Sequence, residues 1–365
     1  MKKLNSDRAL FQPRVVVALL LCSLSVSLAV ISLEARPLRS QKLAARTAPA
    51  SAEVVPQAPT TPGMPRYYNY APGPGVGESA GEPSIGFNLT SKKVMYVSNV
   101  RTLQATLPED ITPLGSVPMA CNADWVDVSF ATTSLRSVDP ILFTDQLTGR
   151  TFVSQLNTVT QSNPVLIGLN SLMAYTDDDG LNWTPAQINP PDGSNDHQTV
   201  GAGAYPVSLP LGNPVNKGSA VYYCGQGGYV LAVTSIAYCS RSDDGGLTFN
   251  KSVPAYNDVV NCSQAIHGHV KVAPDGTVYL PNAQCGGGQA VAVSTDAGTT
   301  WTVRTVPGSA TPSGIIDPQV AVSKDPPVAP ATSNTMYFAY AGPADGGNHM
   351  FVAVTKDRGV TWSTP

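Results

Sequence analysis

The chain has 365 residues, a formal net charge of −3, 13% charged residues, 32 glycines and 32 prolines. This composition is typical of short strands joined by many turns and argues against a helical protein. The small negative charge gives no reason to expect nucleic acid or another polyanion as a partner.

The N-terminus has the pattern of an export signal. Basic residues predominate up to Arg14, and residues 15–33 then run without a charge. This order is typical of a secretory signal, and Ala35 supplies a small residue ahead of a cleavage point. The apolar run is also long enough to remain as a membrane anchor. We therefore expect residues 1–35 to be a signal peptide or an anchor, and the protein to be secreted or extracytoplasmic.

Residues 36–78 are rich in Pro, Ala, Gly and Thr and show no hydrophobic period. Such a segment predicts an extended, poorly ordered linker. From there to residue 365 a different pattern begins, in which a short strand, a turn and a second β-branched or aromatic strand follow one another. We expect five such hairpins, starting near residues 82, 139, 205, 269 and 317. Pro274-Asp275-Gly276 provides the clearest of their turns.

A second repeat, Ser/Thr-x-Asp-x-Gly-x-x-aromatic, occurs four times at regular intervals, which is a strong signal of a repeat architecture. In each copy the Asp accepts hydrogen bonds from the turn's own amides, the Gly takes a positive φ, and the aromatic ring packs beneath. The shared positions are Thr176, Asp178, Gly180 and Trp183; Ser242, Asp244, Gly246 and Phe249; Ser294, Asp296, Gly298 and Trp301; and Thr355, Asp357, Gly359 and Trp362.

These four turns resemble the Asp-box, or bacterial neuraminidase (BNR) repeat, of the sialidase-like (neuraminidase) superfamily. The resemblance implies an all-β fold over residues 79–365, a sialidase-type β-propeller of four-stranded antiparallel blades with the box between the third and fourth strands. About five blades are present and six are expected in the complete ring, so we expect the propeller to be truncated at its C-terminus. The box specifies fold better than activity, because sialidases, other glycosidases, receptors and non-catalytic assembly factors share it.

Five cysteines follow the signal, and an exported protein can oxidise them. Cys262 lies between two expected blades and Cys285 follows a second strand, so both should lie at the same rim. We therefore predict a Cys262–Cys285 disulfide. The odd number leaves at least one thiol free or paired with a residue outside this chain.

The expected blades place candidate ligand residues on the face opposite the boxes, where the inner strands begin. Their carboxylates would act on a sugar or hold a cation, or else cap the blades by bonding to neighbouring loops. The candidates are Glu82, Arg101, Asp139, His197, Tyr205, His267, His269 and Asp317.

Two features raise the question of a metal. His267 and His269 lie on one side of a strand, either as a metal pair or as a hydrogen-bonded lining. The acidic runs 177–179 and 243–244 would attract calcium, or else satisfy themselves within their turns. We predict no metal site and no required cofactor.

Sialidases grip the substrate carboxylate with three arginines, use a Tyr activated by a Glu as nucleophile and an Asp as acid/base. The first arginine belongs to an Arg-Ile-Pro segment, where this chain has Glu82. Arg150 and Arg358 fall on the box face, which leaves Arg101 and, less clearly, Arg136 and Arg304. We cannot assemble an arginine triad, so the catalytic residues stay unknown and enzymatic activity, possible for a glycoside hydrolase, stays open.

The sequence thus favours an exported propeller that binds or processes glycans or glycoconjugates, without support for exo-α-sialidase chemistry. The alternative is a non-catalytic scaffold for a protein partner. We expect no nucleic acid, and membrane contact only through an uncleaved N-terminal segment.

Overall fold

The computed structural model divides the chain into two units, residues 1–55 and 56–365. The residues that the structure describes all belong to the second unit: 70, 72, 83–98, 100–108, 123–130, 137–158, 168–188, 196–206, 218–227, 236–257, 262, 267–310, 317–344 and 347–363. The predicted signal or anchor, nearly all of the predicted linker, and Glu82, Cys121 and Arg136 therefore lie outside the described residues.

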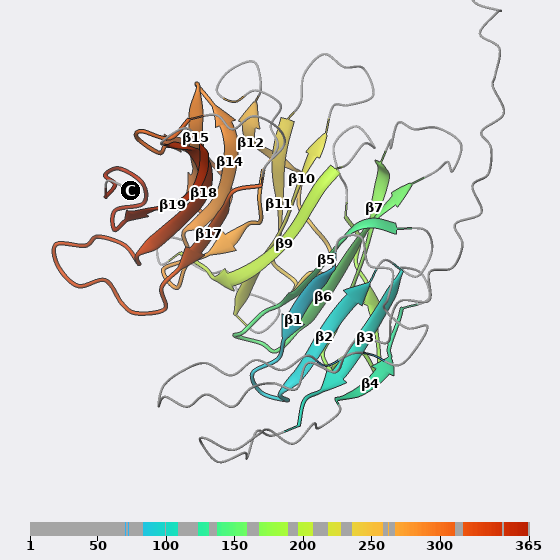
Figure 1. Ribbon diagram of the computed structural model, residues 1–365. Coiled ribbons are helices and arrows are strands. Elements are labelled where there is room, and N and C mark those ends of the chain that lie inside the picture. The colour runs from blue at the N-terminus through green and yellow to red at the C-terminus, as the bar shows by residue number, and fades with distance from the viewer. Residues whose placement is uncertain are drawn as a thin grey trace, which may run out of the picture. The chain divides into compact units, whose positions relative to one another are not determined.

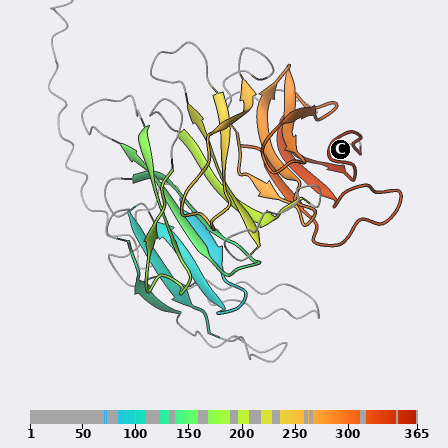
Figure 2. The same ribbon diagram turned by 180° about the vertical axis from the view of Figure 1, so that it is seen from behind.

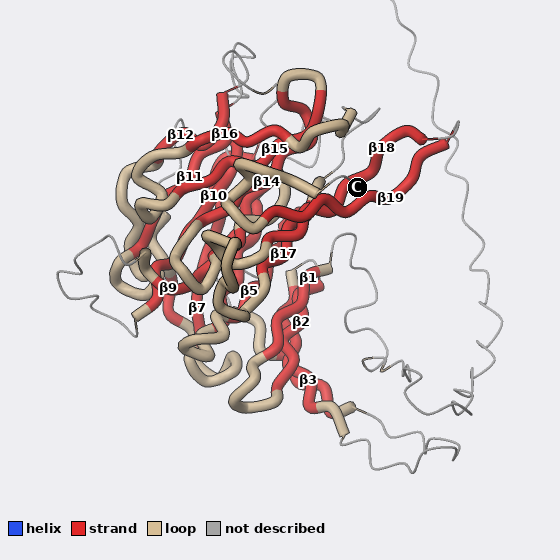
Figure 3. Tube along the Cα trace, turned by 90° about the vertical axis from the view of Figure 1, so that its left-hand side faces the viewer, coloured by secondary structure: helices blue, strands red, loops and turns tan. Residues whose placement is uncertain are grey.

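The described residues form five antiparallel sheets and no helix (Figure 1, Figure 3). Within each sheet the strands follow chain order, so each sheet is a meander. The first is β1 (Ser84–Phe87), β2 (Lys93–Ser98), β3 (Arg101–Thr106) and β4 (Asp124–Asp127), and the second is β5 (Ser137–Thr144), β6 (Thr151–Thr158), β7 (Gly168–Thr176) and β8 (Thr184–Pro185).

The remaining three sheets continue in the same way. They are β9 (Asp196–Ala204), β10 (Ser219–Gly227), β11 (Ile236–Ser242) and β12 (Val253–Asn257); then β13 (Lys271–Val272), β14 (Val278–Cys285), β15 (Gly288–Ser294) and β16 (Thr302–Thr305); and last β17 (Gln319–Val322), β18 (Met336–Ala344) and β19 (Gly347–Thr355). The fifth sheet has three strands among the described residues.

Successive sheets meet through their first strands. β1 lies against β5, β5 against β9, β9 against β13, and β13 against β17, and the sheets follow one another in chain order in both ribbon views (Figure 1, Figure 2). Meanders that share an inner row of first strands are the blades of a β-propeller. The predicted all-β propeller fold, with about five blades of antiparallel strands, is confirmed.

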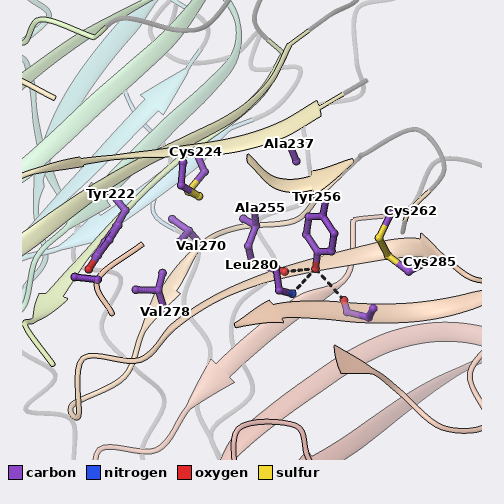
Figure 4. Packing of buried hydrophobic residues seen from close by; sticks show 14 of the residues in the cluster. Tyr222, Cys224, Ala237, Ala255, Tyr256, Cys262, Val270, Val278, Leu280 and Cys285 are labelled. Carbon is purple, nitrogen blue, oxygen red and sulfur yellow. Dashed lines mark hydrogen bonds between the residues drawn. A yellow bond between two sulfur atoms is a disulfide. The ribbon is translucent and has the colours of Figure 1, made fainter. Parts of the chain in front are cut away.

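The second strands of the second, third and fourth sheets are buried on both faces, because each of these sheets has a neighbouring sheet on either side. All nine residues of β10 are buried. Tyr222 packs with Val278 and Leu280 of the fourth sheet, whereas the next residue, Tyr223, packs with Phe152 of the second. Figure 4 shows the first of these clusters. Burying one such side chain contributes roughly 1.5–3 kcal/mol, so the contacts between sheets are the main source of stability.

Two disulfides lie in this part of the molecule (Figure 4). The predicted Cys262–Cys285 bridge is present. A second bridge, Cys224–Cys239, was not predicted; its two cysteines face each other directly across β10 and β11. That pairing depends on the register of two strands, which cysteine spacing does not reveal. Loops of this length give about 3 kcal/mol each in the chain-entropy account.

The four repeated Asp-Gly turns, residues 176–183, 242–249, 294–301 and 355–362, share one hydrogen-bond pattern. In the third, the Ser294 hydroxyl donates to Asp296 Oδ1 (2.8 Å) and accepts the Gly298 N–H (2.8 Å), and Asp296 accepts the Thr300 N–H (2.9 Å). Equivalent bonds occur in the other three turns. Three turns join the third and fourth strands, as expected, and the last follows β19.

The residue before each turn glycine also has a positive φ, which the sequence did not reveal. These residues are Asp179 (55°), Gly245 (78°), Ala297 (55°) and Arg358 (60°). For the first three, the backbone carbonyl accepts a hydrogen bond from a side chain of the preceding sheet. The donors are Gln104 Nε2, Arg150 Nη1 and Arg241 Nη1, in that order. The turns therefore join neighbouring sheets as well as strands within a sheet.

Candidate functional site

A cavity of about 320 Å³ lies where the inner strands begin, at the opposite end from the repeated turns. All five sheets or the segments leading into them contribute to it, and five of the eight predicted ligand residues line it. We call it the His–Asp cavity; its lining is Pro83, Ser84, Asp139, Pro140, Ile141, His197, Gln198, His267, His269 and Asp317.

Two of its residues have an unusual backbone conformation. Asp139 and His197 both have a φ of 48°, which is uncommon for residues other than glycine. They occupy matching places near the start of β5 and β9, and the buried Gln198 side-chain amide donates to the Asp139 backbone carbonyl. Such strained residues cluster at binding and catalytic sites, where the surrounding structure holds them.

Histidines and carboxylates meet across the cavity. His197 Nδ1 lies 3.5 Å from Asp317 Oδ1, and both side chains are partly exposed. The rings of His197 and His267 meet edge to face, with centroids 6.5 Å apart. His267 is buried, and its Nδ1 lies 2.9 Å from the Gly268 carbonyl oxygen. The carboxylates supply hydrogen-bond acceptors, and the imidazole rings supply both donors and acceptors in the same cavity.

Two of the three cavity histidines are uncharged near neutral pH. Burial, and to a smaller extent the neighbouring His197 and His269, lowers the pKa of His267 to about 4. Burial, Lys271 and His197 lower the pKa of His269 to about 4 as well. Both imidazoles are therefore neutral at pH 7 and take part as hydrogen-bonding groups rather than as cations.

This burial predicts a pH-dependent stability. The folded-state pKa of about 4 lies below the unfolded value near 6.5, so each histidine contributes stability that is present above pH 6.5 and lost as the pH falls towards 4. We expect His269→Gln to reduce the slope of unfolding free energy against pH in this window by up to about 1.4 kcal/mol per pH unit. Urea denaturation between pH 4 and 7 measures it. Exposed His349→Gln is the control, and an unchanged slope in His269→Gln would contradict the assignment.

Two predicted residues do not line the cavity, and a third cannot be placed because it lies outside the described residues. Tyr205 lies at the other end of β9, where its hydroxyl donates to Asp243 Oδ1 (2.7 Å). Desolvation and this carboxylate raise the pKa of Tyr205. The expected hairpin start at residue 205 is therefore wrong, because the inner strand begins at Asp196. Arg101 lies at the start of β3 and pairs with Asp127 (2.6 Å) instead of lining the cavity. Glu82 lies outside the described residues.

The true strand includes His197-Gln198-Thr199-Val200, which runs into a small-residue segment and which the expected hairpin start at residue 205 left out. Gln198 of this strand lines the cavity without being among the eight candidates. A strand with glycine and alanine at alternate places has a weak β propensity, so the stronger Tyr205-Pro206 signal dominated.

No arginine or lysine is among the described residues that line the cavity. Arg150 and Arg358, expected on the face of the repeated turns, do form ion pairs there, with Asp177 and Asp275. The acidic runs considered for calcium are likewise engaged: Asp177 by Arg150, and Asp243 by Arg241. Within the described part of the chain, no group of three or more His, Cys, Asp or Glu side chains is placed to hold a metal ion.

Several solved structures are similar to this chain at low sequence identity. The chain is similar to the intramolecular trans-sialidase from Ruminococcus gnavus (14% identity, 77% of this chain and 82% of that one, TM-score 0.43). It is also similar to an α-L-arabinanase from Penicillium chrysogenum (13%, 77% and 79%, 0.42) and to the Aleuria aurantia lectin (12%, 78% and 77%, 0.42). At these values the similarity transfers no site or activity. No protein-family model and no curated protein matches the chain.

Among the described residues, no helix could cross a membrane.

Proposed function

We propose that this protein is an exported, Asp-box β-propeller that binds neutral glycans in the His–Asp cavity. The observation that carries the proposal is the lining itself, where Asp139 and Asp317 accompany three histidines and a glutamine, and where no arginine or lysine is among the described lining residues. Sugar hydroxyls need acceptors and donors within one small concave site, and this lining supplies both.

The charge of the cavity sets the class of glycan. The two carboxylates and the neutral imidazoles of His267 and His269 form hydrogen bonds with hydroxyl groups, whereas the carboxylates repel the carboxylate of an acidic sugar. A site that grips such a carboxylate would need arginine forks. Neutral hexoses or pentoses are therefore the expected ligands, and sialosides are not.

Two further observations support the location and the carboxylate roles. Two intramolecular disulfides suit an oxidising compartment outside the cytoplasm. Asp139 and Asp317 come from different sheets and open into the same cavity, and a pair of carboxylates is also the minimum equipment for glycoside hydrolysis. The proposal therefore includes hydrolysis of neutral glycosides by Asp139 and Asp317.

A panel of neutral and sialylated oligosaccharides tests this function with the wild-type protein, Asp139→Asn and Asp317→Asn. Asparagine tolerates the positive φ at position 139, so that variant keeps its backbone. We expect the wild type to bind neutral sugars and each variant to bind about tenfold or more weakly, because a charged hydrogen bond contributes about 1.5–3 kcal/mol.

Asp124→Asn, an exposed change on β4 outside the cavity, is the matched control and should bind as the wild type does. Fluorogenic neutral glycosides, assayed beside a fluorogenic sialoside, separate binding from hydrolysis. Preference for sialylated ligands would overturn the assignment to neutral glycans. The absence of any glycan that binds would overturn the proposal and favour the protein-interaction scaffold.

A further inference from the structure

A second cavity, of about 470 Å³, lies at the opposite ends of the same inner strands and shares no lining residue with the His–Asp cavity. Residues from all five sheets line it. We call it the apolar cavity, because most of its side chains are hydrocarbon: Leu89, Phe143, Leu147, Val270, Val272 and Val322.

The composition of β9 keeps this space open. Its contribution to the lining is Gly201, Ala202, Gly203 and Ala204, so no side chain there is larger than a methyl group. A Cβ at Gly201 or Gly203 would lie 2.9 or 2.7 Å from a methyl of Val270 or Val272. The glycines thus let β13 approach closely, while the two alanines fill little of the cavity.

Lys271 contributes a charged side chain to this mostly apolar lining. It is the first residue of β13, and its side chain has no hydrogen bond or ion pair with any other described residue. Burial alone lowers the pKa of Lys271. Desolvating an ammonium group without a partner is unfavourable, so the fold retains a cation that an incoming anion would stabilise.

The carboxylate beside this lysine is already engaged. Asp145 also lines the apolar cavity, but it accepts hydrogen bonds from the Leu147 N–H (3.0 Å) and the Thr148 hydroxyl (2.7 Å) of its own turn. Lys324, which is exposed, adds a second cation to the lining. The charge in the cavity that lacks a partner is therefore positive.

We propose that the apolar cavity binds a small apolar carboxylate, with the carboxylate group against Lys271 and the hydrocarbon chain among the leucine, valine and phenylalanine side chains. The cavity volume lies within the range of small-molecule sites, roughly 300–1,000 Å³. A partly buried cation in a mostly hydrocarbon lining matches a ligand with one anionic end and one apolar end. The proposal does not rest on glycan binding, since the two cavities share no lining residue.

Calorimetric titration of the full, disulfide-bonded chain with octanoate and with its neutral counterpart octanamide tests the proposal. We expect octanoate to bind about tenfold or more tightly than octanamide, since a hydrogen bond to a charged group contributes about 1.5–3 kcal/mol. Lys271→Met should remove this preference by weakening octanoate about tenfold or more. Lys271→Arg should keep it.

Lys251→Met, a change at an exposed lysine remote from the cavity lining, is the matched control and should bind like the wild type. Lys271→Met should also raise the melting temperature of the ligand-free protein, because it removes a partly buried charge that has no ion pair among the described residues, and so excludes misfolding as the cause of lost binding. Equal affinity for octanoate and octanamide, binding of neither, or an unaffected Lys271→Met variant would each overturn the proposal.

Discussion

Gly276→Ala is expected to lower the free energy of unfolding by about 3 kcal/mol or more, whereas Gly218→Ala should lower it by about 1 kcal/mol. The two glycines have nearly the same backbone conformation, with φ values of 81° and 79°. A methyl group at either position therefore meets the same local strain. Any difference between the two variants reports on what surrounds the glycine.

The surroundings differ sharply. A Cβ at Gly276 would lie 2.2 Å from the backbone nitrogen of Pro206, which follows β9 of the neighbouring sheet, whereas no other described residue lies within 4 Å of a Cβ at Gly218. Backbone atoms cannot move aside as a flexible side chain can, so Gly276→Ala must push the fourth sheet away from the third. Urea denaturation of both variants under non-reducing conditions measures the difference. Equal destabilisation would show that the two sheets separate easily at this point.

Arg150→Ala is expected to destabilise the protein by about 2–3 kcal/mol, because hydrogen bonds made by a buried charged group contribute about 1.5–3 kcal/mol. The guanidinium bonds to Asp177 (2.6 Å) in its own sheet, donates to the Gly245 carbonyl of the next sheet, and lies 3.9 Å above the Tyr175 ring. Its side chain is only 8% exposed. The alanine variant loses all three contacts and leaves a buried carbonyl without its donor.

Arg101→Ala is the matched control for this prediction. Arg101 forms an ion pair with Asp127 of the same 2.6 Å length, but its side chain is 52% exposed. Removing an exposed pair typically changes stability by about 0–1 kcal/mol. Arg150→Lys should fall between the two, because an ammonium keeps the charge but cannot form the planar fork. Similar losses in Arg150→Ala and Arg101→Ala, measured by chemical denaturation, would contradict the structural role given to Arg150.

The fold was predictable because its signals are local. Each repeated turn carries its own hydrogen-bonding residues, as Ser294, Asp296 and Gly298 illustrate, so a short sequence window suffices to recognise it. The Cys262–Cys285 bridge followed from the expected positions of two strand ends. Cys224–Cys239 did not, because it depends on which residues of β10 and β11 stand opposite each other.

The site was predictable only in part, for a physical reason. Asp139, His267, His269 and Asp317 were found because they stand close to where recognisable inner strands begin. Tyr205 was misplaced because β9 is built of small residues that resemble a loop in sequence. The cavity around Lys271 is lined by residues of five separate sheets and their turns. No single stretch of sequence contains that information.

The hydrogen bonds from side chains to the main-chain carbonyls of the repeated turns make the two sides of each sheet interface differ in their sensitivity to mutation. The acceptor is a main-chain oxygen, supplied in turn by an aspartate, a glycine and an alanine at positions 179, 245 and 297. No substitution deletes a main-chain oxygen, so the acceptor of this hydrogen bond between sheets is kept when the residue that carries it is replaced. The donor is one side chain per interface, so a single substitution of that residue removes the hydrogen bond between the two sheets. Duplicating or exchanging one of these modules should therefore succeed only when the module before it brings a side chain long enough to reach across.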